Sequence, residues 1–541
     1  ELTRLIDTTG PAFDIRKMYM GTYPKTIKPN GESVPKMTED LIRAFEDGSL
    51  IINFTGHGSE KVWTDEMILT DRIIASLRNK TYPFLVTATC EFGRHDDPQQ
   101  TSSAELAITM KEGGAIGMVT TARPVNATTN FDLNQAFYEA LLQRAGNGFK
   151  CIGEVFRETK NNSISGVSNR NFSLLADPSM TLALPEQLIR ITSVKTANAS
   201  DTLKALSTVI IKGQIENTDG ALLTNFSGTA EIALFNKETD FATTGRTNPV
   251  FRFKEWNNVL FRGEATVTNG EFDLTFMLPK NISYAVGKGK LSAYARDVNG
   301  NDAHGFSEDF LIGGTELNVI SESSPPEIDL FLGDTTFVNG GVTTPDTYLI
   351  ALLSDESGVN ISNYGIGNSL IAVLDDNAAT YVLNDHYLAA ADQSEKGMIR
   401  YPLNDLSPGS HRITLKAWDI FNNGSQSTID FVVTDGDQIV IESLGNYPNP
   451  FVGQTTIFFT HNRSGDDLEA QLFIYSPAGN LIKSIEIPVS QGEYKIDLLE
   501  LDNGTNGPKK LPAGLYLARL IIRSLTNGSK SEQVTKLIIL N

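Results

Sequence analysis

The periodicity of apolar residues changes at Pro185, and this change constrains the fold more than any other feature of the sequence. Before Pro185, short apolar runs alternate with amphipathic stretches, a pattern typical of an α/β unit with a largely parallel sheet. After it, helical periodicity largely vanishes, and alternating strands separated by Asn, Asp and Gly turns continue to the end. We therefore predict an α/β unit over residues 1–186 that is followed only by β-domains.

Individual elements of the α/β unit are readable from short apolar runs and from apolar residues spaced three and four apart. The predicted strands are β-branched and bounded by Gly or Pro, and they cover Leu50–Phe54, Phe84–Thr89 and Ala115–Thr120. The predicted helices cover Thr38–Phe45, Ser103–Lys111, Phe131–Arg144 and Ile152–Thr159. The order is strand, helix, strand, helix.

The β-rich part divides into three predicted β-sandwiches of immunoglobulin-like (Ig-like) type, over 187–316, 327–436 and 440–541. A boundary is expected at Ser321–Pro326, because consecutive prolines and serines resist both helix and sheet interior. With 541 residues, the chain is long enough for several cores of the usual ~100–200 residues each.

The formal net charge of −20 argues against two classes of partner. It opposes the phosphate contacts on which nucleic-acid binding depends, and it opposes adhesion to anionic lipid. No apolar run approaches the ~20 residues of a membrane-spanning helix, and the start has no signal-peptide pattern. The chain also begins without Met, directly before a dense catalytic-type pattern, so we expect an N-terminal part of the same protein to be missing.

Two loops that follow predicted strands carry the residues best suited to chemistry. His57 lies in Thr55-Gly-His-Gly-Ser-Glu60 after the first strand, and Cys90 follows the second. Neighbouring parallel strands would bring both residues to one sheet edge, where sites of open α/β sheets gather. An adjacent imidazolium lowers the thiol pKa from its unperturbed ~8.5 and later protonates the leaving amine. We therefore predict Cys90 as nucleophile and His57 as its base.

Two backbone amides near this pair are predicted to form the oxyanion hole, those of Gly58 and Cys90. Gly56 and Gly58 let the loop turn tightly and let an N–H group approach a substrate carbonyl. Trp63 is a candidate wall of the substrate cleft, with core packing as its alternative. The alternative for the pair itself is a His in a turn and a Cys that is buried after a strand.

The second cysteine, Cys151, starts an amphipathic helix, so core packing is its expected role. His95, Asp96 and Asp97 are weaker candidates for binding a metal or orienting the site, with a solvated acidic loop as the alternative.

The motifs Asn53-Phe-Thr-Gly-His-Gly-Ser-Glu60, Ala88-Thr-Cys90 and Leu175-Ala-Asp-Pro-Ser-Met180 resemble those of the gingipain-type cysteine peptidases, in the same order. The resemblance implies a caspase-like fold, Cys90 as nucleophile and His57 as general base. We also predict Trp63, Glu91 and Phe92 at the substrate cleft, expect no required cofactor and leave structural calcium open. The family completes its site with an acid upstream of the histidine, on a strand that this chain barely includes or lacks.

Two further segments resemble the cell-surface sortase of the type IX secretion system: Cys90-Glu-Phe-Gly-Arg-His-Asp-Asp-Pro98 and the terminal run from Asn446-Tyr-Pro-Asn-Pro-Phe451 onward. That resemblance implies an extracellular enzyme that cleaves C-terminal signal domains from cargo and transfers the new carboxyl end to anionic lipopolysaccharide. It also implies docking on the outer-membrane barrel PorV through residues 440–541. A secreted gingipain-like endopeptidase and a non-catalytic surface scaffold or adhesin are the alternatives.

Overall fold

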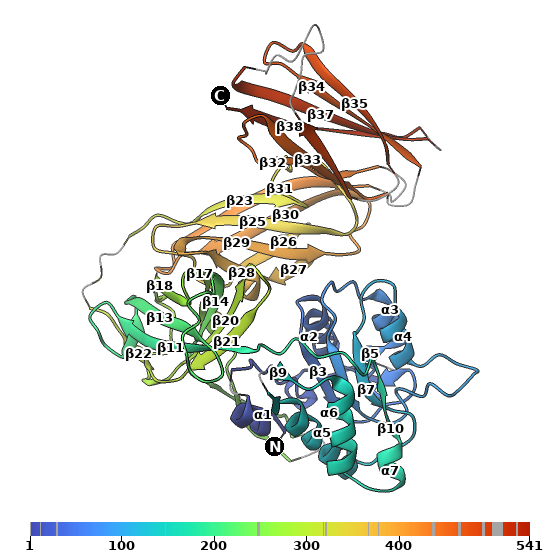
Figure 1. The fold of residues 1–541 in the computed structure, drawn as a ribbon. Helices are drawn as coiled ribbons and strands as arrows, with labels where there is room; N and C mark the ends of the chain where they lie inside the picture. The colour runs from blue at the N-terminus through green and yellow to red at the C-terminus, as the bar shows by residue number, and fades with distance from the viewer. Residues whose placement is uncertain are drawn as a thin grey trace.

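The computed structural model (Figure 1) describes all residues except 1, 11, 29–30, 147, 246–248, 318, 320–321, 366, 377, 435–438, 464–466, 490–492, 500–511, 526–527 and 541. An α/β unit lies beside a series of β-units that runs to the C-terminus. None of the described helices combines the length and the apolar character needed to cross a membrane.

A four-stranded sheet with strand order β10-β7-β6-β3 forms the centre of the α/β unit. β3 (Ile51–Thr55), β6 (Phe84–Ala88) and β7 (Gly117–Thr121) pair in parallel, as the sequence predicts. The edge strand β10 (Phe172–Leu175) is antiparallel to β7 and was not predicted as a strand. All five residues of β6 and of β7 are buried, as expected for strands that are covered on both faces.

Helices cover both faces of this sheet because alternate strand residues supply two separate cores. Ile52, Leu85 and Met118 face the first core, together with apolar residues of α2 (Pro35–Glu46), α3 (Asp71–Ser76) and α4 (Ser103–Thr109). Phe84, Val86 and Val119 face the second core with α5 (Ala127–Leu141) and α6 (Ile152–Asn162). The smaller elements are α1 (Leu2–Thr9), η1 (Met20–Thr22), β1 (Thr26–Lys28), β2 (Gly31–Ser33), β4 (Val62–Trp63), β5 (Leu69–Thr70), β8 (Arg144–Ala145), β9 (Gly148–Phe149) and α7 (Val167–Arg170).

The two middle β-units share one sheet and one core. An 11-stranded sheet runs β18-β13-β11-β21-β20-β14-β17-β28-β29-β25-β23, joined across the boundary where Gly263 of β17 pairs in parallel with Ala389 of β28. The strands of the first unit are β11 (Gln187–Thr196), β12 (Thr202–Ala205), β13 (Thr208–Glu216), β14 (Gly228–Phe235), β15 (Thr239–Ala242), β16 (Arg252–Glu255), β17 (Val259–Val267), β18 (Glu271–Met277), β19 (Gly287–Lys288), β20 (Lys290–Asp297), β21 (Asp302–Ser307) and β22 (Leu311–Thr315). Those of the second are β23 (Glu327–Leu332), β24 (Val342–Thr343), β25 (Thr347–Ser354), β26 (Ile371–Leu374), β27 (Ala379–Val382), β28 (Tyr387–Ala390), β29 (Gln393–Leu403), β30 (Gly409–Trp418) and β31 (Gly424–Val433), with η2 at Asn384–His386.

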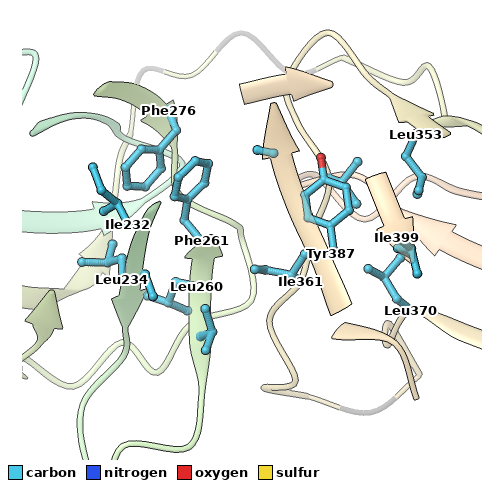
Figure 2. Packing of buried hydrophobic residues seen from close by; sticks show 14 of the residues in the cluster. Ile232, Leu234, Leu260, Phe261, Phe276, Leu353, Ile361, Leu370, Tyr387 and Ile399 are labelled. Carbon is cyan, nitrogen blue, oxygen red and sulfur yellow. The ribbon is translucent and has the colours of Figure 1, made fainter. Parts of the chain in front are cut away.

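Figure 2 shows the apolar side chains on the two sides of this boundary. Phe261 and Phe276 of the first unit stack with ring centroids 3.8 Å apart, and Ile361 and Tyr387 line the facing side of the second. All four belong to one continuous cluster of buried residues. The division into two separate Ig-like domains stays a prediction, and Ser321 of the expected linker lies outside the described residues.

The C-terminal unit has a core of its own. A three-stranded sheet of order β32-β33-β36 faces a four-stranded sheet of order β35-β34-β37-β38. The strands are β32 (Ile441–Tyr447), β33 (Gln454–His461), β34 (Leu468–Tyr475), β35 (Leu481–Val489), β36 (Glu493–Leu499), β37 (Gly514–Ser524) and β38 (Lys530–Ile539). Inward-facing residues alternate along β34 and β37, which is the pattern of a two-sheet sandwich.

Polar contacts connect the α/β unit to both middle β-units. Lys290 Nζ of the first β-unit lies 2.9 Å from Asp14 Oδ1, and the Lys17 amide donates to Glu255 Oε1 at 2.7 Å. His386 of the second β-unit lies 3.9 Å from Asp47, which caps the end of α2.

Asp419, a buried carboxyl group of the second β-unit, pairs with the half-buried Glu322 and gives that unit a pH-dependent stability. Burial and a hydrogen bond with Glu322 raise the pKa of Asp419 to about 7, and the same bond lowers the pKa of Glu322. In the unfolded chain Asp419 ionises near 3.8, so between these two values the folded state retains a proton that the unfolded state has lost. The stability from this proton is present at low pH and is lost as the pH rises through about 7. Burial also raises the pKa of Asp355, which acts in the same direction.

We expect the free energy of unfolding of this unit to fall by on the order of 1–3 kcal/mol between about pH 5 and about pH 8. Asp419→Asn should flatten this dependence. Asp430→Asn, which removes an exposed ion pair with Arg412, should leave it unchanged. Chemical denaturation across the pH range, with a chelator present, measures the effect. A flat wild-type profile would contradict the assignment.

Candidate active site

His57 and Cys90 follow two neighbouring parallel strands at matching positions. Thr55, the last residue of β3, pairs with Ala88, the last residue of β6, and each candidate lies two residues beyond its strand. The Gly56 amide donates to the Ala88 carbonyl at 3.4 Å, which extends the contact between the strands toward the two loops. Adjacent strands lie about 4.8 Å apart. The two loops therefore start side by side at the carboxyl edge of the sheet, as the sequence predicts.

The sulfur of Cys90 contacts the chain that leads into α5. Sγ lies 3.4 Å from the Val125 carbonyl oxygen and 3.5 Å from the Val125 amide nitrogen. Cys90 is half-buried and His57 is exposed, so both are open to solvent at this edge. Within the described residues no hydrogen bond joins Cys90 to His57, and their direct contact stays a prediction.

The two amides predicted to form the oxyanion hole are unused in the described part of the chain. Gly58 and Trp63 lie opposite each other in an isolated antiparallel bridge. The two hydrogen bonds of this bridge are donated by neighbouring residues, from the Ser59 amide to the Val62 carbonyl and from the Thr64 amide to the His57 carbonyl. The bridge therefore leaves the Gly58 N–H unpaired, and no described acceptor faces the Cys90 N–H either. Such free donors are what an oxyanion requires, although their convergence on a single oxygen stays a prediction.

Gly58 has no room for a side chain, which explains why glycine stands there. A Cβ atom at this position would lie 2.5 Å from Thr89 Oγ1 and 2.9 Å from the Val62 carbonyl oxygen. Thr89 directly precedes Cys90, so this close approach joins the histidine loop to the cysteine loop.

Arg94 links the same two loops by ion pairs. Its Nη1 lies 2.9 Å from Glu60 of the histidine loop and 3.4 Å from Glu91 of the cysteine loop. Glu91 has a φ of 56°, a left-handed conformation that is uncommon in residues other than glycine, and it directly follows the nucleophile candidate. Backbone strain of this kind clusters at active sites, where the surrounding contacts maintain it.

Trp63 and Phe92 are core residues, so the prediction that they line the substrate cleft is wrong. They are 1% and 0% exposed, and both belong to the first core of the α/β unit. Trp63 stacks on Phe54 with ring centroids 4.3 Å apart and lies 5.6 Å from the Phe92 ring. Only Glu91, the third predicted cleft residue, is partly exposed. The large aromatic groups turn inward because burying them contributes more than any other side chain of these loops to the core.

The acidic loop after Cys90 is held by arginines. Arg123 Nη1 lies 2.8 Å from Asp96 and lowers the pKa of that carboxyl to about 2, and Arg94 lies 3.7 Å from Asp97. His95, Asp96, Asp97 and the residues up to Thr101 line a cavity of about 560 Å³ beside Glu105. The residues that line this cavity directly follow the cysteine loop in the chain, and most of them are polar. No metal ligand set forms there among the described residues.

Cys151 and a cluster of carboxyl groups belong to other parts of the structure. Cys151 is half-buried and precedes α6, where Ile152 and Val155 supply the buried face. Glu322, Asp355 and Asp419 bring carboxylate oxygens within 4.8 Å of one another in the second β-unit. The expectation that calcium supports the structure stays open.

The residues that sequence reasoning missed lie on α5. Asn130 and Asn134 are 5% and 1% exposed, yet both carry amide side chains into the sheet. Two features of the sequence could have indicated them. Asn130 and Asn134 are four residues apart, which places them on one face of a helix, and Asn126 is a suitable N-cap residue for that helix. The sequence pattern predicts this helix only from Phe131 onward, whereas α5 begins at Ala127.

The part of the chain that contains this site matches a known protein family. Residues 1–183 match the model of Peptidase family C25. This match supports a cysteine-peptidase-like function for the part of the chain that carries Cys90 and His57. No curated protein matches the chain.

Three solved structures are similar to the chain at low TM-scores. Dimeric latent PorU from Porphyromonas gingivalis shares 27% identity over 80% of this chain and 41% of its own, with a TM-score of 0.31. The complex of the Porphyromonas gingivalis RgpB pro- and mature domains shares 14% identity over 58% of this chain and 62% of its own, with a TM-score of 0.29. The Arg-specific cysteine proteinase gingipain R (RGPB) shares 15% identity over 58% of this chain and 61% of its own, at 0.29. The chain thus spans less than two thirds of each of these proteins.

Proposed function

We propose that the chain carries the catalytic part of a cysteine peptidase that acts as a cell-surface sortase, with Cys90 as nucleophile and His57 as base. One observation carries the catalytic assignment: the two residues follow adjacent parallel strands at equivalent positions, inside the segment that matches Peptidase family C25. The sortase assignment is supported by the resemblance of the segment from Cys90 to Pro98 to the type IX sortase, PorU.

The chemistry is acyl transfer in two steps. The Cys90 thiol gives its proton to His57 while sulfur attacks the scissile carbonyl carbon, and the resulting oxyanion accepts hydrogen bonds from the Gly58 and Cys90 amides. His57 then protonates the departing amine, the C–N bond breaks and a thioester remains on Cys90. In the second step an amine attacks the thioester, loses a proton to His57, and the thiol leaves. Water in place of the amine yields hydrolysis.

The cellular role that we propose follows from this second step. The enzyme acts on the extracellular face of the outer membrane, cleaves C-terminal signal domains of type IX secretion cargo and transfers the new carboxyl end to an amine of anionic lipopolysaccharide. Residues 440–541, the type IX C-terminal signal-like unit, dock on the outer-membrane barrel PorV.

Product chemistry tests the proposal against a secreted endopeptidase of gingipain type. In cells that carry the native enzyme, we expect most processed cargo to bear an amide-linked carbohydrate at its new C-terminus, since a surface amine competes with water for the thioester. Mass spectrometry of the C-terminal cargo peptides measures the two products. Free carboxyl ends alone, with normal cleavage, would favour the endopeptidase.

A further inference from the structure

Two buried asparagines on α5 connect both catalytic strands to one helix. We propose that Asn130 and Asn134 are positioning residues that hold the ends of β3 and β6, and the Val125 segment above them, in the arrangement that sets the reactivity of Cys90. This inference rests on the proposed function, because it assigns the control of that same site. Asn130 and Asn134 would touch neither substrate nor sulfur and would act through the backbone.

Asn130 holds the cysteine strand. Its Nδ2 donates to the Ala88 carbonyl oxygen at 2.8 Å, two residues before Cys90. The same oxygen accepts from the Gly56 amide, which directly precedes His57. One carbonyl oxygen therefore joins the helix, the cysteine strand and the histidine loop.

Asn134 holds the histidine strand. Its Oδ1 accepts from Asn53 Nδ2 at 2.6 Å, and its Nδ2 lies 3.3 Å from Thr55 Oγ1, two residues before His57. Nδ2 also lies 3.0 Å from the carbonyl oxygen of Asn130, so the two asparagines contact each other. Together they form a polar network beneath the loops of both candidate catalytic residues.

The beginning of the same helix reaches the sulfur. Asn126 caps α5 and exchanges hydrogen bonds with Thr129, so the first turn is fixed. Val125, the preceding residue, places its amide 3.5 Å and its carbonyl oxygen 3.4 Å from Cys90 Sγ. A hydrogen bond donated to a thiolate favours the charged form, as does the partial positive charge at the N-terminal end of a helix, whereas the carbonyl oxygen favours the neutral thiol. The position of α5 against the strands therefore sets the balance between these contacts and so the reactivity of Cys90.

Packing alone does not explain the asparagines. Leu133, Phe137 and Leu141 of the same helix are fully buried and supply its apolar contact with the sheet. Burying an amide side chain costs free energy unless the amide is hydrogen-bonded. Apolar residues at positions 130 and 134 would therefore pack α5 against the sheet without the need for hydrogen-bond partners. What the amides add is direction, because each bond fixes one atom of the helix against one atom at a strand end. A displacement of about 1 Å in the reacting groups of an active site can lower the reaction rate about 10²-fold.

The test measures the thiol directly as well as turnover. Asn130→Leu and Asn134→Leu keep the side-chain volume close to native and remove the hydrogen bonds. For each we expect alkylation of Cys90 by iodoacetamide, followed across the pH range, to slow by about 3- to 10-fold near neutral pH. We expect kcat to fall about 10- to 100-fold with KM nearly unchanged. Counting active sites by alkylation corrects for any unfolded fraction.

Leu133→Ala is the matched control on the same helix. It removes buried apolar contacts but none of the hydrogen bonds, so it should lower the thermal midpoint and leave the alkylation profile of Cys90 unchanged. If Asn130→Leu fails to fold, Asn130→Ala removes the donor to Ala88 without adding a buried charge. Asparagine variants with a native alkylation profile and native kcat would overturn the proposal, as would an equal shift in Leu133→Ala.

Failure of this inference is distinguishable from failure of the proposed function. The alkylation profile reports on the coupling between α5 and Cys90 without any substrate. If processing of cargo does not depend on Cys90, the peptidase assignment is lost. In that case the alkylation profile of Cys90 still shows whether the asparagines set the reactivity of the thiol.

Discussion

Cells that carry Cys90→Ala should accumulate cargo proteins with their C-terminal signal domains still attached. The substitution removes the only atom proposed to form the thioester, and neither His57 nor the backbone amides are able to replace it. Loss of a nucleophile that acts as a unit with its base typically lowers the rate by about 10⁴-fold or more. Mass spectrometry of surface cargo measures the retained signal domains.

Cys151→Ala is the matched control for this experiment. Cys151 is the second cysteine of the chain and is half-buried like Cys90, but it precedes α6, away from the sheet edge. Its replacement should leave cargo processing intact. Labelling with a small electrophile should also separate the two thiols, Cys90 reacting faster. Normal processing in Cys90→Ala, with no excess reactivity of Cys90, would favour the non-catalytic scaffold or adhesin.

The sequence was sufficient to predict the edge of the sheet at which the site lies. Apolar runs of five or six residues identified β3, β6 and β7, and parallel order followed from the helical patterns between them. Because parallel strands end on the same side, the placement of His57 and Cys90 depended only on strand boundaries. Those boundaries were accurate to within two residues.

The environment of the site was harder to predict, because it depends on contacts distant in sequence. Trp63 lies six residues after His57, and that proximity suggested a cleft wall. Its actual direction is set by Phe54 and Phe92, which lie on other segments. Asn130 and Asn134 are polar residues on an amphipathic helix and would be expected at the surface. Only the positions of Ala88 and Asn53 in the folded chain account for their burial.

The same long-range packing joins the two middle β-units. The proline-rich linker at 321–326 suggested separate sandwiches, each closed on itself. One parallel residue pair between β17 and β28 and a continuous apolar cluster also connect the two units, while their division into separate sandwiches stays a prediction. The pattern of alternation predicts which residue of a strand faces inward, but not which of several sheets the strand joins.

Replacing Trp63 with alanine should destabilise the α/β unit by about 3–5 kcal/mol, the usual cost of truncating a fully buried large aromatic residue. The side chain is 1% exposed, stacks on Phe54 at an interplanar angle of 8° and packs with Phe92. Its backbone also pairs with Gly58, so the cavity would form directly behind the His57 loop. Calorimetry of the α/β transition in the intact protein measures the loss.

Trp63→Phe distinguishes core packing from substrate contact. The indole Nε1 is buried and has no hydrogen-bond partner in the described residues, so a phenyl ring loses volume but no polar contact. We therefore expect Trp63→Phe to cost less than half as much stability as Trp63→Ala, and to leave KM for cargo peptides near the native value. A cleft wall would behave in the opposite way, since Trp63→Ala would then raise KM several-fold at nearly native stability. That result would restore the role in substrate binding that the position of Trp63 beside His57 first suggested.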